Sequence, residues 1–326
     1  MAIITNETTK YDINGIKESV ADFIYNISPT DTPFLANAGR MDVTQPVFSW
    51  QIDALAAAAA NAQLEGDAIV TTPNFAAVVS TTLQSNYTQI SYKAISVSST
   101  ADASAKYGRG TETGLQISKR SLELKRDIEL TCLGNVAVSA GTTAAARKTG
   151  GLATWVRTNV DKGASTNPTA AAPFPVARTD SGSRALTESL VKNMLQLAYT
   201  SGANIGTLLC GPVHKQQVSG FGGIATKTYS MSTPEAAAII GAADIYVSDF
   251  GVLTVVPDRF LRLNSSTSAV ADIWGIDWDA VAVAYLQPFK VDDLAKTGLM
   301  TNKVVSAEWG LMVKNEAALG LVADLA

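Results

Sequence analysis

The 326-residue sequence contains a single histidine, His214, and only two cysteines, Cys132 and Cys210. Any Ser-His-Asp triad or Cys-His pair would have to use that one histidine, and a zinc site would need further ligands at suitable spacing. The two cysteines lie far apart in the chain, which fits a reducing compartment better than a disulfide scaffold. We therefore expect no metal, no cofactor and no enzymatic activity.

Charge and long apolar runs are also scarce. Charged residues make up 17% of the chain and the net charge is −4, which argues against binding nucleic acid through a dense basic surface. The longest near-apolar runs, such as AAAIIGAA from Ala236, are shorter than the roughly 18 residues of a membrane helix. The N-terminus has no basic start before an apolar stretch, so we expect no signal peptide. Hydrophobic residues reach 47%, which predicts a globular chain with a substantial core.

Two short motifs invite a chemical interpretation, and each has a simpler one. In GRGTETG, which contains Gly108, Gly110 and Gly114, the third glycine falls one place late for a dinucleotide-binding loop, so we interpret the glycines as a flexible start to a helix. Asp277 and Asp279 in GIDWDA could ligate a cation or act as acid and base, but a turn with solvated carboxylates is simpler.

His214 and Cys210 lie four residues apart on a predicted strand, turn and helix. They could supply two metal ligands, but a structural zinc site needs about four. Ordinary packing is therefore the preferred interpretation of this pair.

The N-terminal segment predicts two short helices joined by a stiff corner. The first has an apolar stripe formed by Ile16, Val20, Phe23, Ile24 and Ile27. The second lies within SPTDTPFLANAG, where Thr32 is a candidate N-cap, Pro33 suits the first helical position and Gly39 suits a left-handed end. Neither helix has enough neighbouring sequence to bury its apolar face. We therefore expect this arm to lie on the body of the chain or on a neighbouring chain.

Alternation of apolar and polar residues predicts two strands, 47–52 and 89–94, as the legs of one hairpin. The long connection between them, residues 53–80, is unusual in a compact domain. We interpret it as an elongated hairpin whose tip contacts something else.

The longest helix signal spans residues 110–135. One apolar stripe and a weaker second one predict a supporting helix. Lys125 and Glu129, four residues apart, would form a pair on its surface. The first stripe consists of Ile117, Leu124, Ile128 and Cys132, and the second of Leu115, Leu122 and Leu133. Residues 136–184 are rich in Ala, Thr, Gly, Ser and Pro, which predicts an irregular insertion lying on the surface.

The remaining chain predicts an α/β subdomain followed by long strands. The subdomain begins with a helix from Thr187 to Gly202, followed by a buried strand at TLLC and a short helix. It continues with a Thr-Pro helix start in TPEAAAII and with two strands about a turn at 248–251. KVDDLAK predicts a helix start. Residues 303–314 alternate through about 12 residues, which predicts a strand of about 40 Å; Val305, Ala307, Trp309, Leu311 and Val313 share one face, and Ser306, Glu308, Gly310 and Lys314 the other.

Three blocks of sequence resemble the major capsid proteins of tailed bacteriophages. They are NISPTDTPFLANAG near the start, TLLCGPVHKQQVSGF in the middle, and AYLQPFKVDDLAKTG with VVSAEWGLMVKNEAALG near the end. The resemblance implies a mixed α+β fold of the HK97 type. It divides the chain into an N-terminal arm (1–41), an extended hairpin loop (42–98), a spine helix and peripheral part with an insertion (99–185), an axial domain (186–270) and C-terminal strands (271–326).

The resemblance also implies a function. The chain would self-assemble into hexamers and pentamers of an icosahedral head that encloses double-stranded DNA without sequence-specific binding. It would be found in the virion after assembly in the host cytoplasm, with a portal protein, a separate scaffolding protein and no membrane. The prolines would set the corner where the arm leaves its subunit. The expected contacts between subunits are Ile16, Val20, Phe23, Ile24, Pro29, Pro33, Phe34, Leu64 and Glu65.

Three alternatives stay open at this point. An encapsulin-like nanocompartment shares the fold but holds protein cargo. An α/β enzyme would use Asp277 and Asp279, or His214. A fibre or tail protein is disfavoured because the sequence has no internal repeats.

Overall fold

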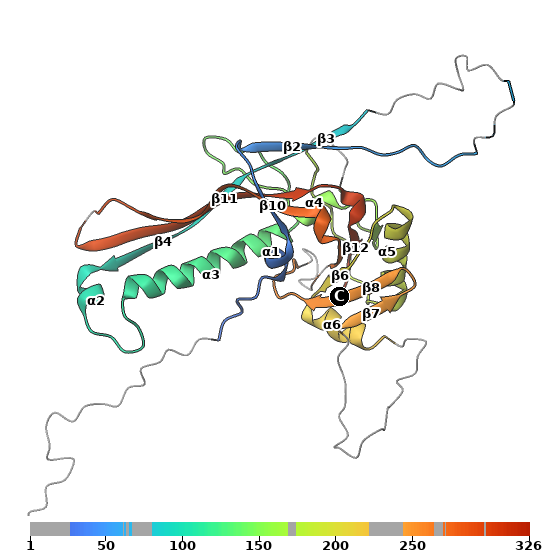
Figure 1. The fold of residues 1–326 in the computed structure, drawn as a ribbon. Helices are drawn as coiled ribbons and strands as arrows, with labels where there is room; N and C mark the ends of the chain where they lie inside the picture. The colour runs from blue at the N-terminus through green and yellow to red at the C-terminus, as the bar shows by residue number, and fades with distance from the viewer. Residues whose placement is uncertain are drawn as a thin grey trace, which may run out of the picture.

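The structure is a computed structural model that describes residues 27–60, 62, 65–66, 80–168, 174–221, 244–263, 270, 272–296 and 298–326. The predicted N-terminal helix, apart from Ile27, lies outside the described residues, as do Leu64 and the segment TPEAAAII. Figure 1 shows two lobes: an elongated one, in which a long helix lies along a sheet, and a compact one around a second sheet.

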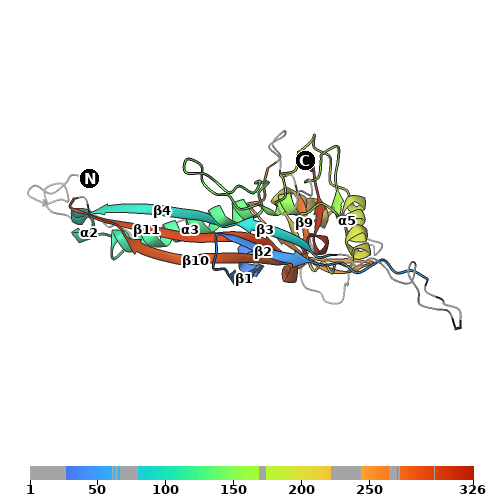
Figure 2. The same cartoon turned by 90° about the horizontal axis from the view of Figure 1, so that it is seen from above.

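The elongated lobe is built on a four-stranded sheet with the order β1-β10-β11-β4. These strands are β1 (Gly39–Asp42), β4 (Gln89–Ser98), β10 (Val281–Asp293) and β11 (Met300–Val313). β1 runs parallel to β10, and the other pairs are antiparallel. Seen from above in Figure 2, β4, β11 and β10 lie side by side along the lobe.

The long helix α3 (Glu112–Cys132) confirms the supporting helix predicted for residues 110–135. The Thr111 side chain caps it by accepting a hydrogen bond from the Gly114 N–H. Leu124, Ile128 and Cys132 are buried against the sheet, as their stripe predicts. The prediction that Lys125 and Glu129 form a pair on the helix surface is wrong, because Glu129 is buried.

The long C-terminal strand is confirmed, because β11 pairs with β10 on one side and β4 on the other. Trp309, Leu311 and Val313 are buried on the predicted face. The opposite face is also covered from Glu308 to Met312, since a side chain at Gly310 would meet the Phe48 ring at 2.7 Å, and Lys314 beyond it is exposed.

A separate hairpin crosses the top of this sheet. β2 (Val47–Ile52) pairs with β3 (Thr82–Tyr87), and not with residues 89–94 as predicted. The predicted second leg is part of β4, which pairs with β11 in the four-stranded sheet. The true partner, TLQSNY, was missed because its buried residues Gln84, Ser85 and Asn86 are polar.

The compact lobe contains a six-stranded sheet with the order β5-β12-β9-β6-β8-β7. Its strands are β5 (Val160–Asp161), β6 (Thr207–Cys210), β7 (Ile245–Ser248), β8 (Gly251–Pro257), β9 (Ile273–Ile276) and β12 (Gly320–Val322). Helices α5 (Glu188–Thr200) and α6 (Pro212–Ser219) pack against it. The buried TLLC strand, the helix ending near Gly202 and the turn between β7 and β8 are all confirmed.

Residues 136–184 are irregular, but the prediction that they lie on the surface is wrong for their middle part. The short helix α4 (Leu152–Trp155) is completely buried and joins the larger hydrophobic core. The predicted helix start in KVDDLAK is also wrong. β10 continues through Asp293, which pairs with Lys303 of β11.

The N-terminal corner contains α1 (Pro33–Asn37), with Pro33 in the first turn as predicted. Thr32 occupies the N-cap position without a side-chain hydrogen bond. Gly39 does not end the helix in a left-handed conformation, because Ala38 is extended and Gly39 opens β1. A side chain at Gly39 would lie 3.2 Å from the carbonyl oxygen of Val281 on the neighbouring strand.

The remaining short elements are helix α2 (Ser99–Ala103), which follows β4, and two 3-10 turns, Trp278–Ala280 and Glu316–Ala318. The division of the chain into segments at residues 41, 98, 185 and 270 remains a prediction.

Candidate functional site

The one histidine has a packing role within the compact lobe. His214 is buried in α6, and its Nε2 lies 3.3 Å from the main-chain oxygen of Ala326. Burial lowers the pKa of His214 and raises the pKa of the Cys210 thiol to about 12. A neutral imidazole and a protonated thiol are the forms expected of packed side chains.

Asp277 and Asp279 lie at the turn that follows β9. The Asp277 carboxylate accepts a hydrogen bond from the Asp279 N–H at 3.1 Å, and so caps the 3-10 turn. Asp279 is exposed. Within the part of the chain that the structure describes, no three His, Cys, Asp or Glu side chains are grouped so that they could hold a metal ion.

The N-terminal corner is attached to its own subunit by a buried carboxylate. The N–H groups of Phe34 and Leu35 each donate to one oxygen of Glu129, both at 2.7 Å. Phe34 is 0% exposed and packs in the larger core, where its ring lies 5.9 Å from that of Trp278. Arg126 Nη1 donates to the Pro29 carbonyl oxygen at 3.4 Å.

These contacts separate the predicted intersubunit residues into two groups. Phe34 is an anchor within its own subunit, so its side chain has no surface left for a neighbour. Pro29 is exposed and Pro33 is half-buried, while Ile27 is fully exposed at the start of the described chain. The arm therefore leaves the body near residue 32.

The hairpin of β2 and β3 is held at its base by a buried polar network. Asn86 Nδ2 donates to Thr149 Oγ1 at 3.0 Å and to the Leu311 carbonyl oxygen at 2.6 Å. Asn86 Oδ1 accepts from the Gly150 N–H at 3.0 Å. These contacts link the hairpin to β11 and to the insertion, which therefore helps to orient the hairpin.

A second set of contacts lies beside the first. Glu308 of β11 accepts hydrogen bonds from Thr88 Oγ1 at 2.8 Å and from Arg147 Nη2 at 2.5 Å. Tyr87 stacks on Phe174 with the ring centroids 5.1 Å apart. The insertion therefore contacts the base of the hairpin at Asn86 and at Tyr87, and contacts β11 at Glu308.

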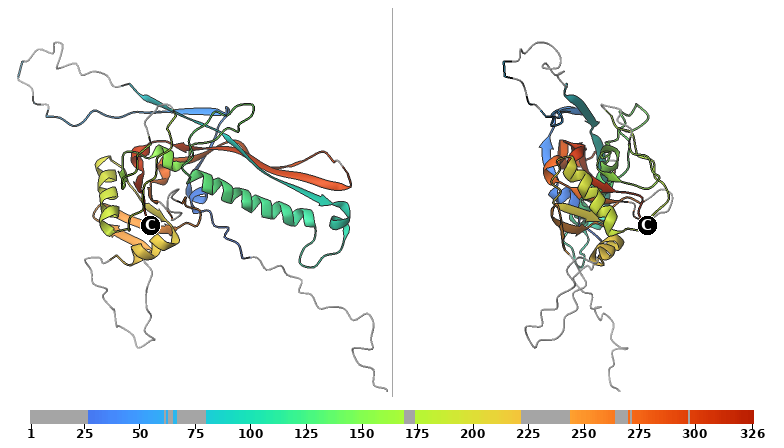
Figure 3. Two further views of the ribbon diagram at one scale, coloured as in Figure 1. Left: turned by 180° about the vertical axis from the view of Figure 1, so that it is seen from behind. Right: turned by 90° about the vertical axis from the view of Figure 1, so that its right-hand side faces the viewer.

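Beyond this base, the described part of the hairpin connection is exposed. Residues 53–60 leave the body from the end of β2, as Figures 1 and 3 show, and Leu55 is 97% exposed. Glu65, one of the predicted contact residues, is also exposed. A well-anchored base with an exposed apolar side chain beyond it suits contact with another molecule.

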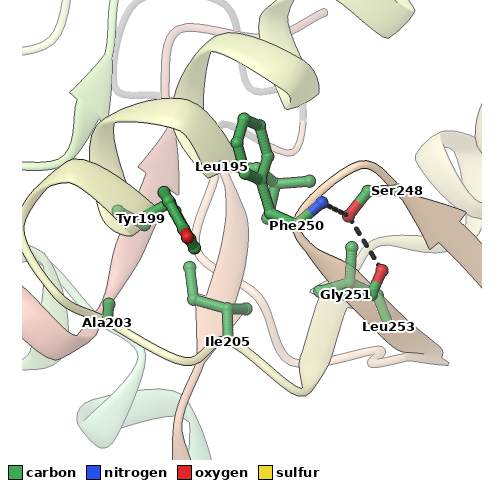
Figure 4. Close-up of a pocket in the computed structure, with 9 residues that line it drawn as sticks. Leu195, Tyr199, Ala203, Ile205, Ser248, Phe250, Gly251 and Leu253 are labelled. Carbon is green, nitrogen blue, oxygen red and sulfur yellow. Dashed lines mark hydrogen bonds between the residues drawn. The ribbon is translucent and has the colours of Figure 1, made fainter.

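The free edge of the compact lobe carries an exposed apolar patch that the sequence did not single out. It is formed by one face of β7 and β8, and its members are Ile245, Val247 and Val252. Val247 is 73% exposed. Tyr199 and Phe250 lie with the buried Leu253 on the α5 side of the sheet, and their ring centroids are 5.0 Å apart. Figure 4 shows these rings beside the turn in which Ser248 bonds to Phe250 and Gly251.

This patch, called here the β7–β8 patch, lies on an edge strand of the six-stranded sheet. Exposed strand edges and contiguous apolar residues are sites where another chain adds. The alternation in ADIYVSDFGVLTVV predicted the strands, but it could not show which apolar face remains uncovered.

Further exposed apolar residues lie on the elongated lobe. Leu294 and Leu299 are exposed near the turn between β10 and β11, and Leu122 and Leu130 lie on the outer side of α3. Among the described residues, no helix is both long enough and apolar enough to cross a membrane.

A long helix along a sheet, an anchored projecting hairpin and a compact lobe with an exposed apolar edge define a capsid subunit of the HK97 type. Comparison of the structures supports this class. The chain is similar to one from Mycobacterium phage Adephagia, with a TM-score of 0.62 at 12% identity over 97% of this chain and 98% of the other. It is also similar to the holo-SrpI encapsulin complex of Synechococcus elongatus, with a TM-score of 0.54 at 10% identity over 95% and 92%.

Comparison of the sequence is more specific. The chain is 29% identical over 345 residues to the major capsid protein of Escherichia phage Phieco32. The alignment covers 96% of this chain and 95% of that protein. The family model of the SU10 major capsid protein matches residues 3–326. The chain therefore belongs to the SU10 major capsid protein family, and the phage capsid interpretation is confirmed over the nanocompartment.

Proposed function

We propose that this capsid protein assembles into hexamers and pentamers that close into an icosahedral head around double-stranded DNA. The observation that supports this most directly is the pair of extensions that leave the body, the arm and the hairpin, each anchored at its base by buried hydrogen bonds. An extension that is anchored at its base and exposed where it leaves the body, as at Ile27 and residues 53–60, is suited to reach over a neighbouring copy.

The extensions multiply weak contacts. Once one surface of a subunit is bound, an arm or loop on that subunit meets its second site at high effective concentration. A closed shell repeats the same set of interfaces many times. Interfaces of modest net free energy are therefore enough to hold the shell.

Several surfaces of the subunit supply the contacts between copies. The β7–β8 patch meets neighbouring copies around the axis of each hexamer or pentamer, because it lies at the free end of the compact lobe. Pro29, Pro33 and Glu65 contribute to contacts between subunits, together with Ile16, Val20, Phe23, Ile24 and Leu64, which lie outside the described residues.

The subunit has further partners in the assembled head. The net charge of −4 fits a wall that encloses DNA without binding it by sequence. A portal protein and a separate scaffolding protein take part in assembly, which occurs in the host cytoplasm, and the chain ends in the virion. It acts as a structural subunit without catalysis.

The contents of purified particles test this proposal. We expect particles from infected cells to release double-stranded DNA of uniform length on disruption, and to contain hexamers and pentamers in electron micrographs. Particles that instead hold one folded protein cargo and no DNA would support a nanocompartment.

A further inference from the structure

The long helix α3 carries apolar side chains on the side that faces away from the sheet. Leu124 and Ile128 are buried against the sheet, whereas Leu122 points to the other side of the helix and is 41% exposed. Leu115 lies about two turns before Leu122 on that side and is half-buried. The outer side of a surface helix is usually polar, so these leucines, called here the outer flank of α3, form a candidate docking surface.

The base of the arm already follows one side of α3. Glu129, Arg126 and Leu122 are three and four residues apart, so they lie on successive turns. Glu129 accepts hydrogen bonds from two main-chain N–H groups of α1, and Arg126 Nη1 donates to the Pro29 carbonyl oxygen at 3.4 Å. Figure 1 shows the first described residues below α3, on the side away from the sheet. Going back along the arm, the contacts therefore move toward the start of α3, and the next turn carries Leu122.

The segment that precedes Pro29 has a matching surface. The sequence predicts a helix over residues 16–27 with one apolar stripe, which consists of Ile16, Val20, Phe23, Ile24 and Ile27. Glu18 and Asp22 fall on the opposite face of that helix and would stay in water. Ile27, the one member of the stripe that the structure describes, is fully exposed. Two apolar surfaces that need a partner therefore begin close to one another.

The lengths of the two surfaces also agree. Residues 16–27 are equal in number to residues 115–126, and as helices each would span about 16.5 Å. Only Ser28 separates Ile27 from Pro29, so the Cα atom of Ile27 lies within about 7.6 Å of that of Pro29. A connection this short favours the α3 of the same chain over that of another copy.

We propose that the predicted helix of residues 16–27 docks on the outer flank of α3 of its own subunit before assembly. The docked helix runs parallel to α3 and covers both its own apolar stripe and Leu122. In the proposed head, the arm reaches a neighbouring copy only after it leaves this flank. That last step rests on the proposed function, whereas the docking itself is a property of the single subunit.

Hydrogen–deuterium exchange of the unassembled full-length chain tests the docking. An isolated helix of this length is marginal in water, so protection of the amides of residues 16–27 reports the docked state. We expect protection on the order of tenfold to a hundredfold, the factor that burial of one large apolar side chain supplies, and we expect it to persist on dilution. Leu122→Asp should remove the protection. Leu197→Asp, at a leucine of α5 that is 42% exposed, is the matched control and should keep it.

Thiol labelling tests the same contact from the α3 side. Cys132 and Cys210 are buried, so the thiol of a Leu122→Cys variant is labelled before them. We expect its labelling to become on the order of tenfold faster when residues 1–28 are removed, because the covering helix is lost. Labelling of a Leu197→Cys variant should not change. This measurement keeps the proposal testable if the Leu122→Asp chain does not fold.

Three results would overturn the proposal. The first is a wild-type arm whose amides exchange at their intrinsic rates, and the second is a labelling rate of Leu122→Cys that is the same with and without residues 1–28. The third is protection that disappears on dilution together with a dimer in sedimentation velocity, since the arm would then dock on a second copy. All of these measurements use the subunit before assembly, so failure to form a head would not affect them.

Discussion

Asn86 and Thr149 are hydrogen-bonded at 3.0 Å although 63 residues separate them. Asn86 belongs to the projecting hairpin, and Thr149 belongs to the insertion whose role the sequence left open. Leu311 of β11 completes the group, because its N–H donates to Thr149 Oγ1 at 3.0 Å and its carbonyl oxygen accepts from Asn86. The insertion thus takes part in setting the base of the hairpin.

Asn86→Ala should destabilise the unassembled subunit. Removing a fully buried side chain leaves the Gly150 N–H and the Leu311 carbonyl oxygen without this partner, which costs about 1–3 kcal/mol for each unsatisfied group. Denaturant unfolding of the variant measures the loss. Asn37→Ala, at an exposed asparagine on α1, is the matched control and should change the free energy of unfolding by less than about 1 kcal/mol. Equal effects of the two variants would contradict the network.

Phe34→Ala should weaken the attachment of α1 to the body. The side chain is completely buried in the larger core, so its loss should cost about 3–5 kcal/mol of subunit stability. Leu55→Ala, at an exposed apolar position, should cost little. Thermal unfolding of the two unassembled variants measures the difference, and a Phe34→Ala subunit as stable as Leu55→Ala would show that α1 is not part of the core.

Removing residues 1–32 should prevent shell formation and leave a folded subunit. The cut lies before Phe34 and before β1, which are parts of the body, whereas a deletion through residue 39 would also remove a core side chain and the start of β1. Electron microscopy and unfolding measurements report assembly and folding separately. Normal shells formed by the truncated chain would contradict the role given to the arm.

Val247→Asp should block assembly without unfolding the subunit. Val247 is 73% exposed on the β7–β8 patch, so a charge there costs little in the isolated chain but would be buried at the proposed axis. Val176→Asp places the same charge at an exposed valine of the insertion and should still assemble. Sedimentation velocity separates shells from subunits. Shells with normal yield from Val247→Asp would remove the β7–β8 patch from the list of contacts.

The sequence predicted the elements whose burial is regular. The stripe containing Leu124, Ile128 and Cys132 identified α3, and the alternation through Trp309 and Leu311 identified β11, because one periodic face of each element meets the core. The resemblance of three short blocks supplied the fold, and the comparisons confirmed it.

The errors come from polar residues with tertiary roles. Gln84, Ser85 and Asn86 show no apolar alternation, yet all three are buried in β3, where Ser85 is hydrogen-bonded to Ser49 and Asn86 to Thr149. Glu129 looks like a surface residue of a helix, but the N–H groups that bind it come from a segment 94 and 95 residues away. Such contacts depend on the folded arrangement, so no local pattern predicts them.

The central claim is that this chain builds a closed shell, and the mass and shape of the purified protein test it most directly. The chain is co-expressed with the other head-assembly proteins, and the purified protein is measured by light scattering and negative-stain electron microscopy. We expect uniform, closed particles in the megadalton range, with about a hundred or more copies of the 34.1 kDa chain held together by one repeated set of interfaces. A protein that stays a monomer or a small discrete oligomer under those conditions would contradict it.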